Sequence, residues 1–163
     1  MISEYSLGRY GWVMRLAFVT MAISPAAACV ALWPFGGAWT LGLAVVALGA
    51  LSAAFVDADP IMAPRTHATV VGRAHTVLGG VLLAGFPPAA LIAGIGVAPT
   101  LAWVLTTASV VPFAGLLWFL RAGAPARGQG GSPQIRIGWP DRFCLLAYLA
   151  WVVLAAISVL RAA

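Results

Sequence analysis

Lysine is absent from this chain of 163 residues, and charged residues of any kind make up only 8% of it. Soluble domains carry roughly 25% charged residues. Apolar residues reach 63%, and a domain this small has too much surface for its volume to hide them from water. The composition therefore excludes an ordinary soluble domain and predicts an all-α integral membrane protein, folded as a single helical domain over residues 1–163.

Cysteine is scarce too, with only Cys29 and Cys144. On the expected span positions they lie at depths roughly 20 Å apart, whereas a disulfide needs Cα atoms within about 7 Å. Both are expected to be free thiols packed as small apolar groups.

The net charge of +5 does not indicate nucleic-acid binding. The nine basic residues are all arginines, and they sit at helix ends and in short loops rather than on one basic face. Arginines beside apolar spans more often set topology or contact anionic headgroups. The expected surroundings are the lipid bilayer and integral membrane protein partners, with no nucleic acid.

Five apolar runs predict a bundle of five transmembrane helices. Prolines at Pro25, Pro87-Pro88 and Pro112 are expected to kink three of them, because proline removes a backbone donor. The carbonyls freed near Leu83 and Ala84 must then find partners within the protein. The expected spans are about 11–33, 38–56, 74–96, 101–120 and 141–160.

These spans place the N-terminus, the polar stretch 57–75 and the loop 121–140 on one face. Eight of the nine arginines fall on or near that face, and only Arg161 falls on the other. By the positive-inside rule the charged face is cytoplasmic and the C-terminus lies opposite, in a multi-pass protein of the cell (inner) membrane.

Six polar residues at span ends can converge on the charged face. Acid, base and cation in a partly dehydrated site suit general acid–base chemistry or proton handling. Equally, these side chains can pair with one another and fix the helix ends. No residue is assigned a catalytic role. The candidate polar cluster comprises Glu4, Asp57, Asp59, His75, Asp141 and Arg142.

No metal site is expected, because His67 and His75 are eight residues apart and lack a helical ligand spacing. A bis-histidine haem is not expected either, since both histidines come from one loop-to-helix segment. His75 alone could ligate a chlorophyll-type magnesium, although one histidine at a span end is more often a hydrogen-bonding residue. The cofactor, if the protein has one, is unknown.

Four motifs occur in a fixed order: ISEYSLGRYGWVMRLAF near the start, AFVDADP after the second run, GRAHTVLGG opening the third, and GWPDRF followed by Trp151. Together they resemble the membrane family known as domain of unknown function 998. The resemblance implies a helical membrane fold without an assigned activity. The family's polar positions correspond to Ser3, Glu4, Asp59, His75 and Arg142.

Members of that family usually carry a further helix before the SEY-like motif, at which this sequence begins. With that helix and a cytoplasmic N-terminus, the polar face would be extracytoplasmic. The family topology and the arginine count thus favour opposite orientations.

Two functions remain open. The first is a non-catalytic accessory or structural subunit of a larger integral membrane complex, of respiratory or photosynthetic type. Scant extramembrane mass, the lack of a catalytic motif and small residues spaced for close helix packing favour it; the small-residue pairs are Ala38/Gly42, Ala50/Ala54 and Gly80/Ala84. The alternative is a membrane-embedded enzyme or small transporter that uses the polar cluster.

Overall fold

The structure, a computed structural model, describes residues 7–60, 68–124 and 138–162. These residues form helices and short connections, and the described part contains no strand. Apolar segments fold this way because a helix satisfies its own backbone hydrogen bonds where water is absent. The elements are α1 (Gly11–Gly36), the 3₁₀ turn η2 (Gly37–Thr40), α2 (Leu41–Ala53), α3 (Val70–Gly96), α4 (Pro99–Ala108), α5 (Val110–Gly123) and α6 (Gly138–Ala162).

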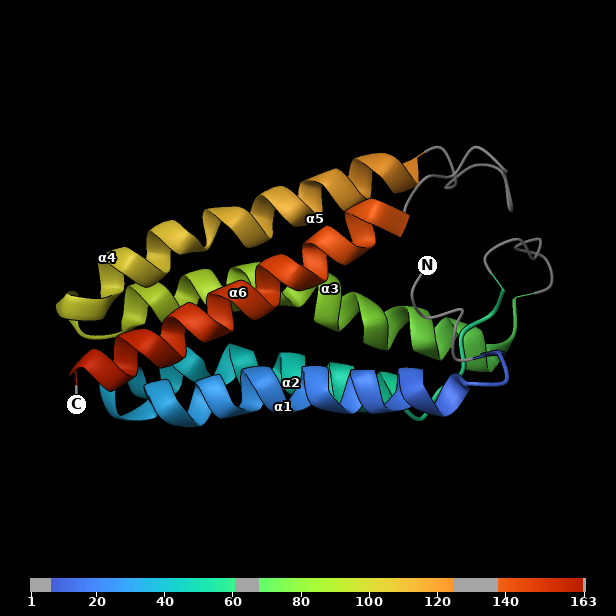
Figure 1. Cartoon of the computed structure of the whole chain (residues 1–163), viewed down its shortest axis with the longest axis horizontal. Coiled ribbons are helices and arrows are strands. Elements are labelled where there is room, and N and C mark those ends of the chain that lie inside the picture. Colours follow the sequence, from blue (N-terminus) through green and yellow to red (C-terminus); the bar gives the residue numbers. More distant parts are fainter. Residues whose placement is uncertain (1–6, 61–67, 125–137, 163) are drawn as a thin grey trace.

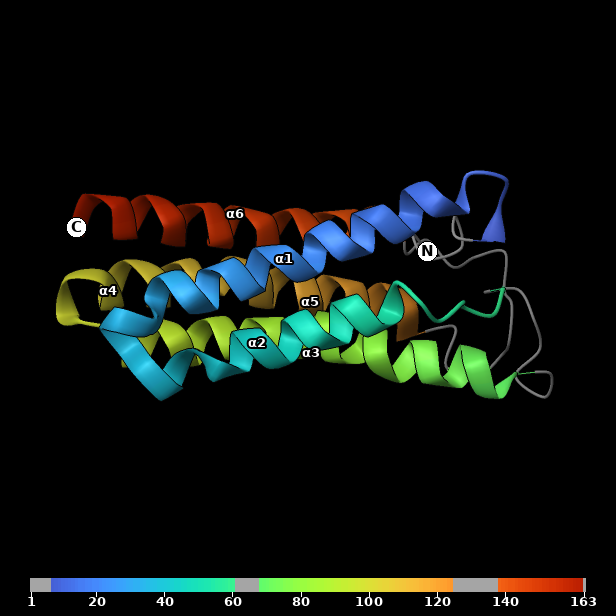
Figure 2. The same ribbon diagram turned by 90° about the horizontal axis from the view of Figure 1, so that it is seen from below.

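The expectation of five spans is wrong: four helical segments of the described chain are long and apolar enough to cross a membrane. The first two predicted spans account for the difference. Because α1, η2 and α2 follow one another without a non-helical residue between them, they count as one helical stretch, Gly11–Ala53. The chain reverses at Gly37, whose φ of 51° suits glycine, and α2 packs back along α1 (Figure 2). With 13 residues, α2 is only about 20 Å long, which is shorter than the hydrocarbon core.

The fourth predicted span is divided rather than continuous. It consists of α4 and α5, which meet at Ser109, three residues before Pro112. Proline cannot donate to the carbonyl four residues earlier, so the helical ladder is interrupted at this point. By contrast, α1 continues through Pro25 and α3 through Pro87 and Pro88.

The helices lie side by side along one long axis, so that their ends gather in two groups (Figure 1). The starts of α1, α3 and α6 and the ends of α2 and α5 lie together at one end, here called the polar end. The turns after α1 and α3 and the end of α6 lie at the opposite end. The gathering of the polar segments therefore agrees with the sequence prediction.

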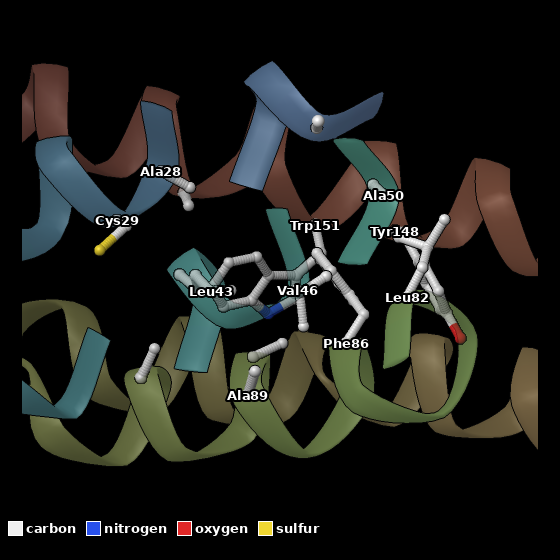
Figure 3. Close-up of a cluster of buried hydrophobic side chains, with 14 of the residues drawn as sticks. Ala28, Cys29, Leu43, Val46, Ala50, Leu82, Phe86, Ala89, Tyr148 and Trp151 are labelled. Carbon is white, nitrogen blue, oxygen red and sulfur yellow. The ribbon is translucent and has the colours of Figure 1, made fainter. Parts of the chain in front are cut away.

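The core is centred on aromatic side chains of α3 and α6 (Figure 3). Phe86 stacks on Tyr148 with ring centroids 4.4 Å apart and meets Trp151 edge-on at 5.9 Å. Leu43 and Val46 of α2 are also fully buried here. Such aromatic pairs add about 0.5–1.5 kcal/mol beyond their buried area, so they help to hold the middle of α6 against α3.

The same two aromatic residues of α6 also donate hydrogen bonds to other helices. The Tyr148 hydroxyl donates to the carbonyl oxygen of Leu83, whose usual donor is missing because residue 87 is proline. This contact confirms the expectation that the carbonyl near Leu83 has a partner. The Trp151 indole N–H donates to the carbonyl of Leu105 at 3.1 Å and to the hydroxyl of Ser109 at 3.0 Å. Trp151 therefore holds α6 against the break between α4 and α5.

Both cysteines are free and buried, as the sequence predicts. Cys144 donates to the Tyr148 hydroxyl at 2.9 Å. The other six tryptophans are all exposed, in keeping with a belt at the level of the headgroups; they are Trp12, Trp33, Trp39, Trp103, Trp118 and Trp139.

Candidate functional site

The described members of the candidate polar cluster all lie at the polar end. Asp57 and Asp59 follow α2, and His75 lies in the second turn of α3. Asp141 lies in the first turn of α6, directly before Arg142. Glu4 lies outside the described residues. The fold thus brings these residues to one end of the bundle (Figure 1), and their individual contacts decide what they do there.

Asp59 fixes the start of α3 through Thr69. One carboxylate oxygen accepts from the Thr69 backbone N–H at 2.9 Å, and the other accepts from the Thr69 hydroxyl at 2.8 Å. The same hydroxyl accepts from the Gly72 N–H at 2.9 Å, so Thr69 is the N-cap of α3. The negative charge also lies near the positive end of the helix dipole. Asp59 therefore stabilises the first turn of α3.

Gly72 makes this arrangement sterically possible. A Cβ atom added to Gly72 would lie only 2.1 Å from the Asp59 carboxylate. No side chain larger than hydrogen fits between the carboxylate and the helix. Asp59, Thr69 and Gly72 therefore form one unit, here called the α3 clasp.

Asp57 pairs with a residue of α1 instead. An Arg15 guanidinium nitrogen lies 3.1 Å and 3.4 Å from the two Asp57 carboxylate oxygens. Both side chains are half exposed, so solvent screens the attraction and the pair contributes little to stability. The pair nevertheless connects α1 with the segment that follows α2.

His75 is buried beneath the polar end and contacts a backbone carbonyl. Its Nδ1 lies 2.6 Å from the carbonyl oxygen of Val56, and because a carbonyl only accepts, Nδ1 carries the proton. Phe18 of α1 meets the imidazole edge-on at 5.9 Å. When the ring is neutral, the lone pair therefore lies on Nε2. Within the described part of the chain no buried side-chain nitrogen or oxygen lacks a partner.

Asp141 and Arg142 open α6. Asp141 is 4% exposed, and its place in the first turn suits the helix dipole. Arg142 donates to the Gly138 carbonyl at 3.3 Å, and its guanidinium lies 5.8 Å from the centre of the Trp139 ring. Both residues make further interactions in the structure.

The chemistry available at the polar end is hydrogen bonding and ion pairing that connect segments. Asp59 and His75 each contact backbone or capping groups rather than one another. Across residues 7–60, 68–124 and 138–162, no three histidine, cysteine, aspartate or glutamate side chains are grouped to hold a metal ion.

Sequence reasoning selected Asp59 and His75 but did not find their partners. Thr69 stands directly before the apolar residues that open α3, which is a local signal of an N-cap, whereas Gly72 has no such signal. The role of Arg15 and the acceptor carbonyl of Val56 have no comparable local signal, because both contacts join distant parts of the chain.

The long apolar helices and the gathering of polar segments at one end define the class of the molecule: a multi-pass α-helical membrane protein. Within that class the chain belongs to the family described as Protein of unknown function (DUF998), whose model matches residues 1–158. The resemblance inferred from the four motifs is thereby confirmed. No curated protein and no solved structure matches the chain.

Proposed function

We propose that this chain is a non-catalytic accessory or structural subunit that packs against a larger integral membrane complex, of respiratory or photosynthetic type. The observation that carries the proposal is the use of the polar residues. Asp59 holds the N-cap of α3, Asp57 pairs with Arg15, and His75 contacts the Val56 carbonyl. Each contact closes the polar end of the bundle, as a scaffold requires.

A surface of α3 supports contact with a partner helix. A Cβ atom added to Gly80 would meet no atom within 4 Å, and Ala84, four residues later, is exposed. Small residues four apart on an outward helix face let another helix approach closely. The small residues of the other two pairs lie mostly inside the bundle: Gly42 lies against Ala89, Ala50 and Ala54 are buried, and Ala38 is exposed.

Native electrophoresis of mild-detergent extracts tests this function. The tagged chain is expected to migrate within an assembly far larger than the monomer. Gly80→Leu should release it from the assembly, because leucine fills the space that the partner occupies, while the open surroundings of Gly80 mean that the monomer's unfolding midpoint should not fall. Val110→Leu, at an exposed position of α5, is the matched control and should remain assembled.

Migration of the wild-type chain as a lone monomer, across detergents and growth conditions, would sink the accessory role. Normal assembly of the Gly80→Leu variant would be compatible with the accessory role but would show that the Gly80/Ala84 surface of α3 is not the contact.

A second function, a membrane-embedded enzyme or small transporter, rests on two observations at the polar end. His75 bonds the Val56 carbonyl through Nδ1, which leaves Nε2 as the basic nitrogen of the neutral ring, and Asp141 is a buried carboxyl at the start of a span. A base and an acid at one membrane face suit proton handling.

The two functions are separated by replacing His75 with asparagine. The asparagine amide nitrogen is as many bonds from the backbone as Nδ1, so His75→Asn retains a donor for Val56 and removes the base. A scaffold tolerates His75→Asn in growth and assembly assays. An enzyme or proton path that uses Nε2 loses its activity in the same variant.

The orientation that we propose places the polar end in the cytoplasm and the C-terminus on the other side of the cell membrane. Arginines support it, since only Arg161 lies at the end of α6. Reporter fusions after Ala163 test it: a C-terminal alkaline phosphatase should be active, and a C-terminal green fluorescent protein dark. The reverse result would favour the orientation implied by the family's additional N-terminal helix.

A further inference from the structure

Positive charge is concentrated at the polar end, and much of it has no acidic partner. Five described arginines lie there: Arg9, Arg15, Arg73, Arg121 and Arg142. Three described acids lie at that end: Asp57 is paired with Arg15, Asp59 is bound to Thr69, and Asp141 is buried in the first turn of α6. Within the described chain, Arg73 and Arg121 form no ion pair. The polar end therefore presents a net positive surface.

The end of α5 and the start of α6 place aromatic side chains beside this charge. Trp118 and Phe143 meet edge-on, with ring centroids 5.4 Å apart. Both are more than 40% exposed, and Trp139 is 76% exposed. Arg121 follows Trp118 by three residues, so the two side chains share one face of α5. Arg142 lies over the Trp139 ring.

We propose that this corner of α5 and α6 binds the headgroup of an anionic phospholipid, with Arg121 as the phosphate ligand. A guanidinium matches phosphate geometry with two parallel N–H donors. Exposed tryptophan at a span end lies at the membrane–water interface, at the level of the headgroups, where its apolar ring and its N–H are both accommodated. Trp118 and Phe143 thus contact the lipid beneath the phosphate that Arg121 holds.

Charge complementarity selects an anionic lipid over a zwitterionic one. A zwitterionic headgroup brings its own cation close to the surface, whereas phosphatidylglycerol adds only negative charge. Arg9, beside the Tyr10 ring, and Arg73 extend the positive field around the same end. Each arginine near an anionic surface contributes about 1 kcal/mol, which corresponds to roughly fivefold in lipid affinity.

Native mass spectrometry of the full chain tests the site. The protein is released from nanodiscs of phosphatidylcholine to which phosphatidylglycerol is added stepwise, and the retained lipids are counted. The wild type should retain phosphatidylglycerol preferentially. Arg121→Ala should lower that preference roughly fivefold, and Arg121→Lys should lower it less, since lysine retains the charge without the paired donors.

Arg161→Ala is the matched control, because it removes the same charge from the last turn of α6 at the opposite end. It should leave the preference unchanged. An equal loss in Arg161→Ala would reveal a general charge effect, and an unchanged preference in Arg121→Ala would exclude the site; either result overturns the proposal. Displacement of the lipid by soluble glycerol 3-phosphate would also overturn it, because the ligand would then be a free anion. Matching unfolding midpoints show that the variants are folded.

Discussion

The Tyr148 hydroxyl of α6 donates a hydrogen bond to the carbonyl oxygen of Leu83 in α3, the acceptor that Pro87 leaves without its helical donor. The hydrogen bond that proline removes from one helix is thus replaced by a side chain of another. Tyr148→Phe should destabilise the bundle by about 1–2 kcal/mol, because a buried carbonyl loses its partner. The stacking on Phe86 is retained. Unfolding of the purified protein in lipid–detergent micelles measures the change.

A double-mutant cycle with Pro87→Ala isolates this contact. Alanine at position 87 restores a backbone N–H that can bond Leu83, so removing the hydroxyl should then cost much less. If Tyr148→Phe costs the same in both backgrounds, the hydroxyl does not act through the Leu83 carbonyl. Tyr148→Phe also removes the acceptor of Cys144, and Cys144→Ala serves as the control for that contribution.

The helices could be predicted from the sequence better than the points at which they begin, end and join. Apolar length indicated each membrane-crossing helix, because a segment of that composition has few other stable conformations in lipid. The start of α3 lies at Val70, four residues before the prediction, because the carboxylate of Asp59 holds Thr69 from ten residues away. The first two predicted spans are connected by the 3₁₀ turn at Gly37, with no non-helical residue between them, so they form one helical stretch. These boundaries depend on contacts that apolar length does not record.

In the candidate site, likewise, the residues could be predicted from the sequence but their contacts could not. Asp59 and His75 stood out as polar residues beside apolar spans. The role of each depends on the position of its partner, which is the Thr69 hydroxyl for Asp59 and the Val56 carbonyl for His75. A carbonyl has no sequence signature, so the contact of His75 could be found only from the fold.

The α3 clasp predicts opposite effects for two glycine substitutions in one helix. Gly72→Ala should destabilise the start of α3, since its methyl group would overlap the Asp59 carboxylate. Gly79→Ala should be neutral or stabilising by up to about 1 kcal/mol, because its Cβ meets open space and alanine favours the helix. Hydrogen exchange at residues 70–74 measures both. Equal protection in the two variants would contradict the clasp.

The two aspartates that follow α2 should respond differently to neutralisation. Asp57→Asn removes a half-exposed ion pair and should change the free energy of unfolding by about 0.5 kcal/mol or less. Asp59→Asn replaces one of two acceptors of Thr69 with a donor and should cost about 1–2 kcal/mol. Chemical unfolding of both variants compares them. A larger loss of stability in Asp57→Asn than in Asp59→Asn would show that Asp57, and not Asp59, is the carboxylate that stabilises the fold.

The indole N–H of Trp151 is expected to stabilise the junction at Ser109, where α4 meets α5. Trp151→Phe retains most of the ring contact with Phe86 but loses the donor to Leu105 and Ser109. We expect a loss of about 1–2 kcal/mol and faster hydrogen exchange around residue 109. Ser109→Ala in the same background should add little, because the Trp151–Ser109 bond is already absent. Additive losses would show that the two residues act independently.

The contact between His75 and Val56 fixes which imidazole nitrogen carries the proton. Nitrogen-15 spectra of the protein in nanodiscs, recorded where the ring is neutral, should show a protonated Nδ1 and an unprotonated Nε2. Most free histidine side chains favour the opposite tautomer, so the outcome distinguishes a held ring from a free one. Phe18→Leu, which removes the ring that meets the imidazole, should leave the tautomer unchanged, because the Val56 carbonyl still accepts the proton. A protonated Nε2 in the wild type would contradict the hydrogen bond, and the base assumed in the second proposed function would then be absent.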